Sequence, residues 1–364
     1  MMKIIALSVI AWVVGLNGHL LLAATIDTVA GTGKPDDNGS IGQATAVNVG
    51  QPFGIEIGPD DALYITEVQN HRVMRVDRKS GQLTTVAGCG KKGHSGDGGK
   101  ATEAKLNEPY EVRFDRKGNM YFVEMMNHVV RRVDAATGVI QTIAGTGEPG
   151  FEGDGGLATH AQFNRPHSIA LDHRGGLYVA DIGNHRIRRI DLETGVIDTI
   201  AGDGGKRPPV DGQLALGNSV VGPRALFIDG DTMWVALREG HSVWTLSLTS
   251  GTWKHIAGTG KQGFGGDNGP AINAMFNGPK GIAVGPDHNV YVVDTENQVI
   301  RMIDTTTHLI STVAGIGPKQ RGGDGDRGPS TEAQMDRPHG IGIGTDGLIY
   351  IGDTNNHRVR CVSP

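Results

Sequence analysis

Two histidines stand at equivalent positions in the sequence and offer imidazole nitrogens for chemistry. His167 and His339 each follow a proline and precede a small residue, in the segments PHS (166–168) and PHG (338–340). An imidazole can exchange protons near neutral pH or bind a metal ion through either ring nitrogen. The position that follows this proline is therefore the first candidate for a functional site.

The proline that precedes these histidines belongs to an internal repeat. Its copies open the repeats at spacings of 57, 57, 57, 56 and 59 residues: Pro52, Pro109, Pro166, Pro223, Pro279 and Pro338. A position that most copies share serves the repeat itself, whereas a position that varies is free to serve a site. The residue after the proline varies strongly, and reads Phe53, Tyr110, His167, Arg224, Lys280 and His339.

Each complete repeat contains the signals of four short strands. Residues 165–202 show them most clearly, as four apolar or alternating runs separated by turns, which predict one antiparallel meander. Residues 25–33 match a fourth strand that lacks the first three, and the last repeat has three strands and lacks the fourth. We expect the N-terminal strand to complete the last sheet, because closing the ring removes the exposed edges. The predicted fold is all-β: one six-bladed β-propeller of four-stranded blades over residues 25–364.

Residues 1–24 lie outside the repeat and are interpreted as a secretory signal peptide. Lys3 precedes an apolar run, and small residues at 23–24 predict cleavage near Ala24–Thr25. An uncleaved anchor is the alternative, although Asn17 and His19 interrupt the run. With cleavage the protein would be secreted or periplasmic and free of the membrane.

The composition limits the function further. The net charge is −5 and no basic block occurs, so we expect no nucleic-acid partner. Cys89 and Cys361 are the two cysteines of the chain, and their predicted places in different strands favour two unpaired thiols. We expect a monomer.

The tripeptide between the second and third strands carries a resemblance. The repeat copies are similar to those of the NHL-repeat family, named after an Asn-His-Leu tripeptide, and the match spans the chain after residue 24: Asn70-His71-Arg72, Asn127-His128-Val129, Asn184-His185-Arg186, Gly240-His241-Ser242, Asn297-Gln298-Val299 and Asn356-His357-Arg358. The resemblance implies the propeller fold and no single function, since members are scaffolds, receptors and enzymes.

Positions that the copies share are interpreted as structural. The tripeptide histidines are expected to tie the turn between strands by hydrogen bonds. The acidic residues that end the second strand are expected to accept backbone or turn hydrogen bonds: Glu67, Glu124, Asp181, Asp294 and Asp353, with Leu237 as the exception.

The variable residues after the proline should meet at one mouth of the channel. In a propeller the first strand lines the channel, and these residues enter it from the face that carries the long inter-repeat loops. Two cations, two histidines and a tyrosine there predict a site for a polar or anionic small molecule, a peptide or a glycan. Glu111, one position further, and Arg238, in the divergent fourth repeat, are added to the predicted ligand-binding set, which is Phe53, Tyr110, Glu111, His167, Arg224, Arg238, Lys280 and His339.

A partial likeness to the peptidyl-hydroxyglycine amidating lyases, which are NHL-like propellers, offers a second reading. In that family Pro-His motifs supply histidines to one central zinc, which implies His167 and His339 as metal ligands. The third histidine is missing, because Phe53 and Lys280 stand in the alternating blades. Glu111 or another channel carboxylate would have to complete the set. Tyr110 would then act as acid or base and Arg224 as the oxyanion partner.

Gly-Asp-Gly loops between the repeats offer a further metal site. Asp324, Asp326 and loop carbonyls are hard oxygen ligands that suit calcium, although their spacing differs from an EF-hand. The alternative is that the glycines form turns and the next segment forms one helical turn that buries an apolar residue. Two functions thus remain open: a secreted binding module, and a zinc-dependent lyase or hydrolase acting on a small polar substrate at the same mouth.

Overall fold

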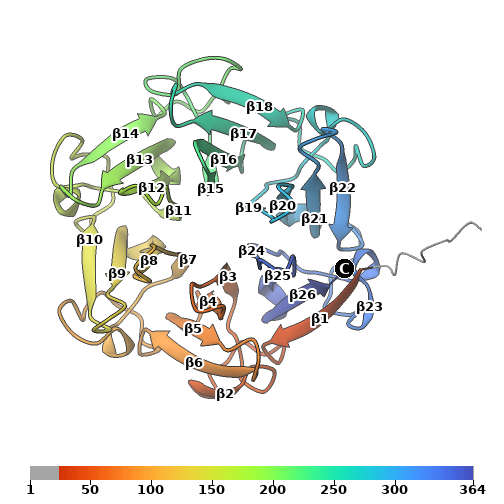
Figure 1. The fold of residues 1–364 in the computed structure, drawn as a ribbon, viewed down its shortest axis with the longest axis horizontal. Helices are drawn as coiled ribbons and strands as arrows, with labels where there is room; N and C mark the ends of the chain where they lie inside the picture. The colour runs from red at the N-terminus through yellow and green to blue at the C-terminus, as the bar shows by residue number, and fades with distance from the viewer. Residues whose placement is uncertain (1–23, 364) are drawn as a thin grey trace, which may run out of the picture.

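A computed structural model describes residues 24–363 and arranges them as a ring of six antiparallel sheets around a central axis (Figure 1). Each sheet is one blade, and its strands follow one another from the axis outward. The predicted six-bladed propeller is therefore confirmed. The proposed signal peptide falls almost entirely outside the described residues.

The two inner strands of each blade lie nearest the axis. The innermost strands are β3 (Pro52–Ile57), β7 (Pro109–Phe114), β11 (Pro166–Leu171), β15 (Pro223–Asp229), β19 (Gly281–Val284) and β24 (Ile341–Ile343). The second strands are β4 (Leu63–Glu67), β8 (Met120–Glu124), β12 (Gly176–Asp181), β16 (Thr232–Leu237), β20 (Val290–Asp294) and β25 (Ile349–Asp353).

The two outer strands complete each blade. The third strands are β5 (Arg72–Val76), β9 (Val129–Val133), β13 (Arg186–Asp191), β17 (Ser242–Ser247), β21 (Val299–Ile303) and β26 (Arg358–Ser363). The outermost strands are β6 (Gln82–Ala87), β10 (Ile140–Ala144), β14 (Ile197–Ala201), β18 (Trp253–Ala257), β22 (Ile310–Ala314) and β1 (Thr25–Ala30).

The N-terminal strand closes the ring. β1 pairs with β26 in antiparallel register, with Thr25 opposite Ser363 and Ile26 opposite Val362, as the repeat pattern predicted (Figure 1). Two sheets carry a short fifth strand at the outer edge, which the repeat pattern did not predict. β2 (Ile41–Gln43) pairs with β6, and β23 (Gly328–Pro329) pairs with β1.

The hydrophobic core lies between neighbouring blades. The loops after the Gly-Asp-Gly segments form single turns of 3₁₀-helix, as expected: η1 (Ala101–Glu103), η3 (Ala158–His160), η5 (Ala271–Asn273) and η7 (Ser330–Glu332). The apolar residue that follows each turn is fully buried: Leu106, Phe163, Phe276 and Met335. Phe163 packs with Val123 of one blade and Ile169 of the next. Burying such a side chain contributes roughly 1.5–3 kcal/mol, so these loops hold the ring together.

Both cysteines are free, as predicted, with Cys89 exposed and Cys361 half-buried. Among residues 24–363, no helix has the length and apolar character required to cross a bilayer.

Candidate functional site

The six residues after the repeat prolines lie together at one end of the central axis. The imidazole of His339 stacks on Phe53 with ring centroids 4.1 Å apart, and Phe53 lies 4.4 Å from Tyr110. Tyr110 in turn meets His167 edge-on at 4.8 Å. We call this set the post-proline ring: Phe53, Tyr110, His167, Arg224, Lys280 and His339.

An irregularity in the inner strands directs these side chains. The pairing of β11 with β12 shifts between Pro166 and Ser168, and that of β15 with β16 shifts between Pro223 and Ala225. A bulge of this kind re-aims a side chain out of the normal alternation of a strand. The residue after the proline can therefore turn toward the axis, while Ile169 and its equivalents point into the core.

The two histidines of the ring are held in one tautomer. His167 Nδ1 donates to the carbonyl oxygen of Arg165 over 2.6 Å, and His339 Nδ1 donates to that of Arg337 over 2.8 Å. A carbonyl oxygen only accepts, so the proton sits on Nδ1 and Nε2 keeps its lone pair. No residue in 24–363 bonds to either Nε2. Burial first, and nearby cations second, hold both imidazole pKa values well below the usual range, so both rings are neutral at pH 7.

Arg224 is the unpaired cation of the ring. Its side chain is 4% exposed, and its guanidinium carbon lies 5.4 Å from the centroid of Tyr110, two blades away. Among the described residues, none accepts a hydrogen bond from this guanidinium or lies at ion-pair distance from it, and the carboxylates of Glu111 and Glu239 act on its charge only from further away. Burial lowers the pKa of Arg224 to about 10, which leaves it charged at neutral pH. A nearly buried guanidinium without an ion-pair partner has the charge and the hydrogen-bond donors that bind an anion.

The other two predicted cations have carboxylate partners. Lys280 Nζ lies 2.8 Å from Glu296 Oε1, which also pairs with Arg337 at 2.9 Å. Burial lowers the pKa of Lys280 to about 8, so it is mostly charged at pH 7 and its charge is largely offset by Glu296. Arg238 is half-exposed beyond β16 and pairs with Glu239 at 3.5 Å.

Within residues 24–363, the side chains around His167 and His339 do not make up a three-ligand zinc site. Glu111, the proposed third ligand, turns along the channel and pairs with Arg113 at 2.7 Å. The rings of Phe53 and Tyr110 stand between the two histidines, and Arg224 and Lys280 add positive charge. Within the described part of the chain, no group of three His, Cys, Asp or Glu residues is arranged to hold a metal ion. Zinc binding stays a prediction that metal analysis can test.

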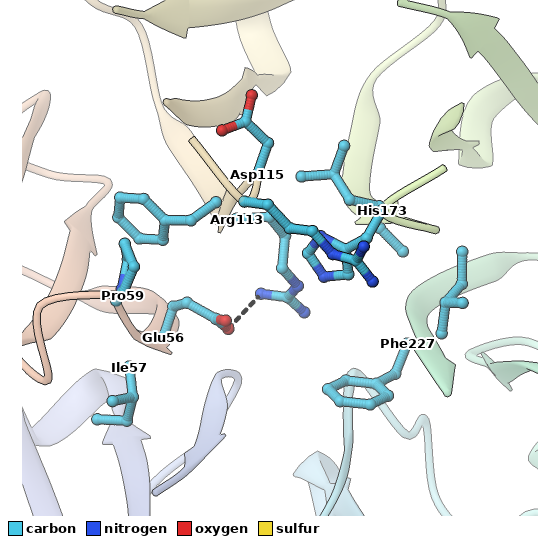
Figure 2. Close-up of a pocket in the computed structure, with 13 residues that line it drawn as sticks. Glu56, Ile57, Pro59, Arg113, Asp115, His173 and Phe227 are labelled. Carbon is cyan, nitrogen blue, oxygen red and sulfur yellow. Dashed lines mark hydrogen bonds and ion pairs between the residues drawn. The ribbon is translucent and has the colours of Figure 1, made fainter. Parts of the chain in front are cut away.

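The opposite end of the channel holds a cavity of about 330 Å³ that the sequence reasoning missed. It lies where β3, β7, β11 and β15 end, and Arg113 projects into it from β7 toward Glu56 of β3, 3.2 Å away (Figure 2). Phe227 faces the cavity from the other side (Figure 2). Burial raises the pKa of Glu56 to about 7, against the opposing effect of Arg113. The signal was present: Glu56 and Arg113 occupy one repeat position, at which the other copies have uncharged residues.

The acidic position of the second strand is structural, as predicted. Glu124 is fully buried and accepts hydrogen bonds from the backbone N–H of Asn107 and from Asn127 and Arg131. Asp181 likewise accepts from Asn164 N–H. These carboxylates join the inter-repeat segment to the blade and are not available to a ligand.

The tripeptide histidines are also structural, but they join blades rather than tie their own turn. In each case Nδ1 accepts the backbone N–H of the residue before the next repeat proline, at distances between 3.0 and 3.3 Å. Gln298 does the same in the fifth blade, where its Oε1 accepts the N–H of Arg337 at 2.6 Å. We call these bonds the inter-blade staples, and their donors are Gln51, Glu108, Arg165, Gly222, Gly278 and Arg337.

The aspartates of the Gly-Asp-Gly loops pair with buried arginines of the third strands. Asp326 Oδ1 lies 2.6 Å from Arg360, and Asp154 Oδ1 lies 2.6 Å from Arg188. Both arginine side chains are fully buried. A guanidinium thus neutralises carboxylates that calcium would need. Calcium binding there stays a prediction without support from this geometry.

Comparison with known proteins identifies the same repeats as NHL repeats. The model of the Teneurin NHL domain matches residues 85–150, and that of the NHL repeat matches residues 163–190, 276–301 and 335–362. The chain is similar to human NHL repeat-containing protein 2, with 27% identity over 330 residues, which cover 82% of this chain and 44% of the relative. The chain therefore spans less than half the length of the curated relatives at the head of this comparison.

Two solved structures share the fold at low identity. An auxiliary nutrient binding protein from Bacteroides thetaiotaomicron has a TM-score of 0.68 at 16% identity, over 93% of this chain and 76% of that one. A streptogramin B lyase has a TM-score of 0.54 at 14% identity, over 94% of this chain and 98% of that one. Likeness at this level concerns the fold alone.

Proposed function

Because this chain is an NHL-repeat six-bladed propeller, we propose that it is a binding module which captures a polar ligand with an anionic group at the post-proline ring. The observation that carries the proposal is Arg224, whose guanidinium is nearly buried and has no acceptor among residues 24–363. Removing an ion from water without a partner is costly. A ligand carboxylate or similar anion would supply that partner.

The fold supports this proposal in a general way. A propeller offers a rigid ring whose variable residues meet at the channel mouth, and one solved neighbour is an auxiliary nutrient binding protein. The anionic group could belong to a small molecule, a peptide or a glycan. We further propose that the protein acts in a secreted or periplasmic location, which N-terminal sequencing of the exported protein would test by finding Thr25 first.

The binding proposal can be tested by charge reversal. Arg224→Glu should abolish capture of an anionic small molecule, peptide or glycan from mixed probe arrays, because the cation that recognises it becomes an anion. Arg116→Glu, an exposed residue at the opposite end of the channel, is the matched control and should bind as the unaltered chain does. Equal binding by both variants and the unaltered chain would place the site elsewhere.

A lyase or hydrolase acting at the same mouth is the second candidate. The observation in its favour is that His167 and His339 are neutral and keep Nε2 free, so either could take a proton from a substrate near Tyr110. A streptogramin B lyase shares the fold. Turnover of a bound ligand that disappears in His167→Ala while binding remains would favour this candidate, and binding without turnover would exclude it for that ligand.

A further inference from the structure

We infer that the ligand of the post-proline ring is a polyhydroxylated monocarboxylate, the chemical class of the sugar acids. The inference rests on the proposed binding function and deepens it. Three features of the ring define this class together: one unpaired cation, two hydrogen-bond acceptors and an aromatic wall.

The charges of the ring favour a ligand that carries a single negative charge. Of the two cations of the ring, Arg224 has no carboxylate at ion-pair distance among the described residues, whereas Lys280 is paired with Glu296. Arg238, beside the ring, is paired with Glu239. One guanidinium matches one carboxylate, and it can donate two parallel hydrogen bonds to it. A phosphate or sulfate dianion would bring a second charge and would need a second cation. Arg165, an exposed residue whose charge acts on His167 and Tyr110, is the candidate, and the phosphate probe below tests it.

The two imidazoles call for hydroxyl groups. His167 and His339 donate through Nδ1 to backbone carbonyls and leave Nε2 as an acceptor without a donor. Burial and the neighbouring cations keep both rings neutral, so Nε2 accepts throughout the neutral pH range. A bare carboxylate such as acetate offers no donor to these atoms. A hydroxylated acid offers one to each.

The aromatic wall calls for a carbon skeleton beside the carboxylate. Phe53 and Tyr110 are in contact at 4.4 Å, are partly exposed, and link the two histidines along the ring. The C–H face of a sugar acid can lie against such rings, while its carboxylate reaches Arg224, whose guanidinium lies 5.4 Å from the Tyr110 centroid. The Tyr110 hydroxyl forms no hydrogen bond with the described residues and adds a further polar contact.

The same chemistry has two sources, a free sugar acid and a uronate unit of a polysaccharide. Titration calorimetry of the full mature chain would separate them. The probes are sodium glucuronate, oligogalacturonate, glucose, acetate and inorganic phosphate. We expect glucuronate or oligogalacturonate to bind about tenfold or more tightly than glucose, acetate or phosphate, since charge and hydroxyls act together. Preference for the oligomer would assign the polysaccharide, and preference for the monomer the free acid.

Variants make the inference specific. Arg224→Gln should remove the preference for glucuronate over glucose, whereas His167→Phe should weaken glucuronate binding and leave acetate binding as it was. Arg116→Gln is the control, and circular dichroism would show that each variant is folded. Arg224→Lys, which keeps the charge, should retain part of the preference.

The outcomes are distinguishable. Equal binding of acetate, phosphate and glucuronate, all lost in Arg224→Gln, would overturn the sugar-acid inference and leave the anion-binding function standing. Failure of every probe to bind in an Arg224-dependent manner would overturn both.

Discussion

The backbone N–H of Arg165 donates a hydrogen bond to Nδ1 of His128 over 3.0 Å, and so joins the third blade to the second. Arg165 has a φ of 52°, a left-handed conformation that is unusual for a residue other than glycine. Such a conformation persists where its surroundings hold it in place, and the staple is one of the contacts that do so. Pro166 and His167 follow directly, so the staple also fixes the start of the strand that carries a residue of the site.

Replacement of His128 would test the staple. His128→Ala leaves the Arg165 N–H without its acceptor and is expected to destabilise the protein by about 1–3 kcal/mol in urea unfolding. His128→Gln should recover most of this loss, because Gln298 already accepts the equivalent N–H in the fifth blade. Equal losses in the two variants would show that packing of the imidazole matters and the hydrogen bond does not.

The staples predict a loss of stability in mild acid. Burial lowers the pKa of His71, His128, His185, His241 and His357, so the folded protein favours the neutral ring that can accept at Nδ1. Stability from a lowered pKa is present above the unfolded value of about 6.5 and is lost as the pH falls through the folded value.

Thermal unfolding between pH 8 and pH 5 measures this effect. Buried carboxylates such as Glu124 and Asp181, whose pKa values are raised to about 7, act in the opposite direction, so the effect is measured against a variant. The Tm of the unaltered chain minus that of His128→Gln should decrease as the pH falls below about 6.5. A difference in Tm between the two proteins that does not change over this range would contradict the role of the staple.

The N-terminal strand should contribute as much stability as any core strand. Ile26 in β1 is fully buried against Met335 and Val362, so Ile26→Ala is expected to cost about 2–5 kcal/mol. Ile41 in β2 is 67% exposed and is the matched control, since Ile41→Ala removes the same atoms from a surface position. A small effect of Ile26→Ala would mean that the ring does not depend on its closure.

Metal analysis tests the zinc hypothesis. We expect the purified protein to contain less than stoichiometric zinc, because Glu111 is paired with Arg113 and no three-ligand group occurs in residues 24–363. The double variant His167→Ala/His339→Ala should then have the metal content of the unaltered chain. Stoichiometric zinc that the double variant loses would instead support the metal-dependent lyase.

Replacement of Glu56 by glutamine is expected to stabilise the protein at high pH. Burial raises its pKa to about 7, so the stability that its protonated form contributes is present in acid and is lost as the pH rises through that value. Glu56→Gln should therefore raise Tm at pH 9 and leave it nearly unchanged at pH 5. A variant less stable than the unaltered chain at pH 9 would show that the ion pair with Arg113 outweighs the burial of the carboxylate.

The fold could be predicted because each blade corresponds to one copy of a regular sequence repeat. The prolines at 57-residue spacing, the lone fourth strand at residues 25–30 and the missing fourth strand at the end together specified the ring and its closure. The buried roles of Glu124 and Phe163 also followed from comparison of the copies. The positions that recur in the copies of the repeat are those that a blade requires to fold and to pack on its neighbour.

The site could be predicted only in part, because its chemistry depends on contacts between blades. The sequence indicated which six residues face the mouth, but not that Glu296 neutralises Lys280 while Arg224 has no partner among the described residues. The staple of His128 was missed because its donor is a main-chain amide 37 residues away, which no side chain marks.

The staples have a consequence for how such a ring can change over time. Every donor is a backbone amide, so the residue that bears it can be Gln, Glu, Arg or Gly without loss of the joint. Each repeat supplies its own acceptor, and the hydrogen bond does not depend on the side chain of the residue that donates it. As far as the staples are concerned, a duplicated or exchanged repeat would therefore need no matching change in its neighbour, and the residues that face the mouth can diversify while these hydrogen bonds stay the same.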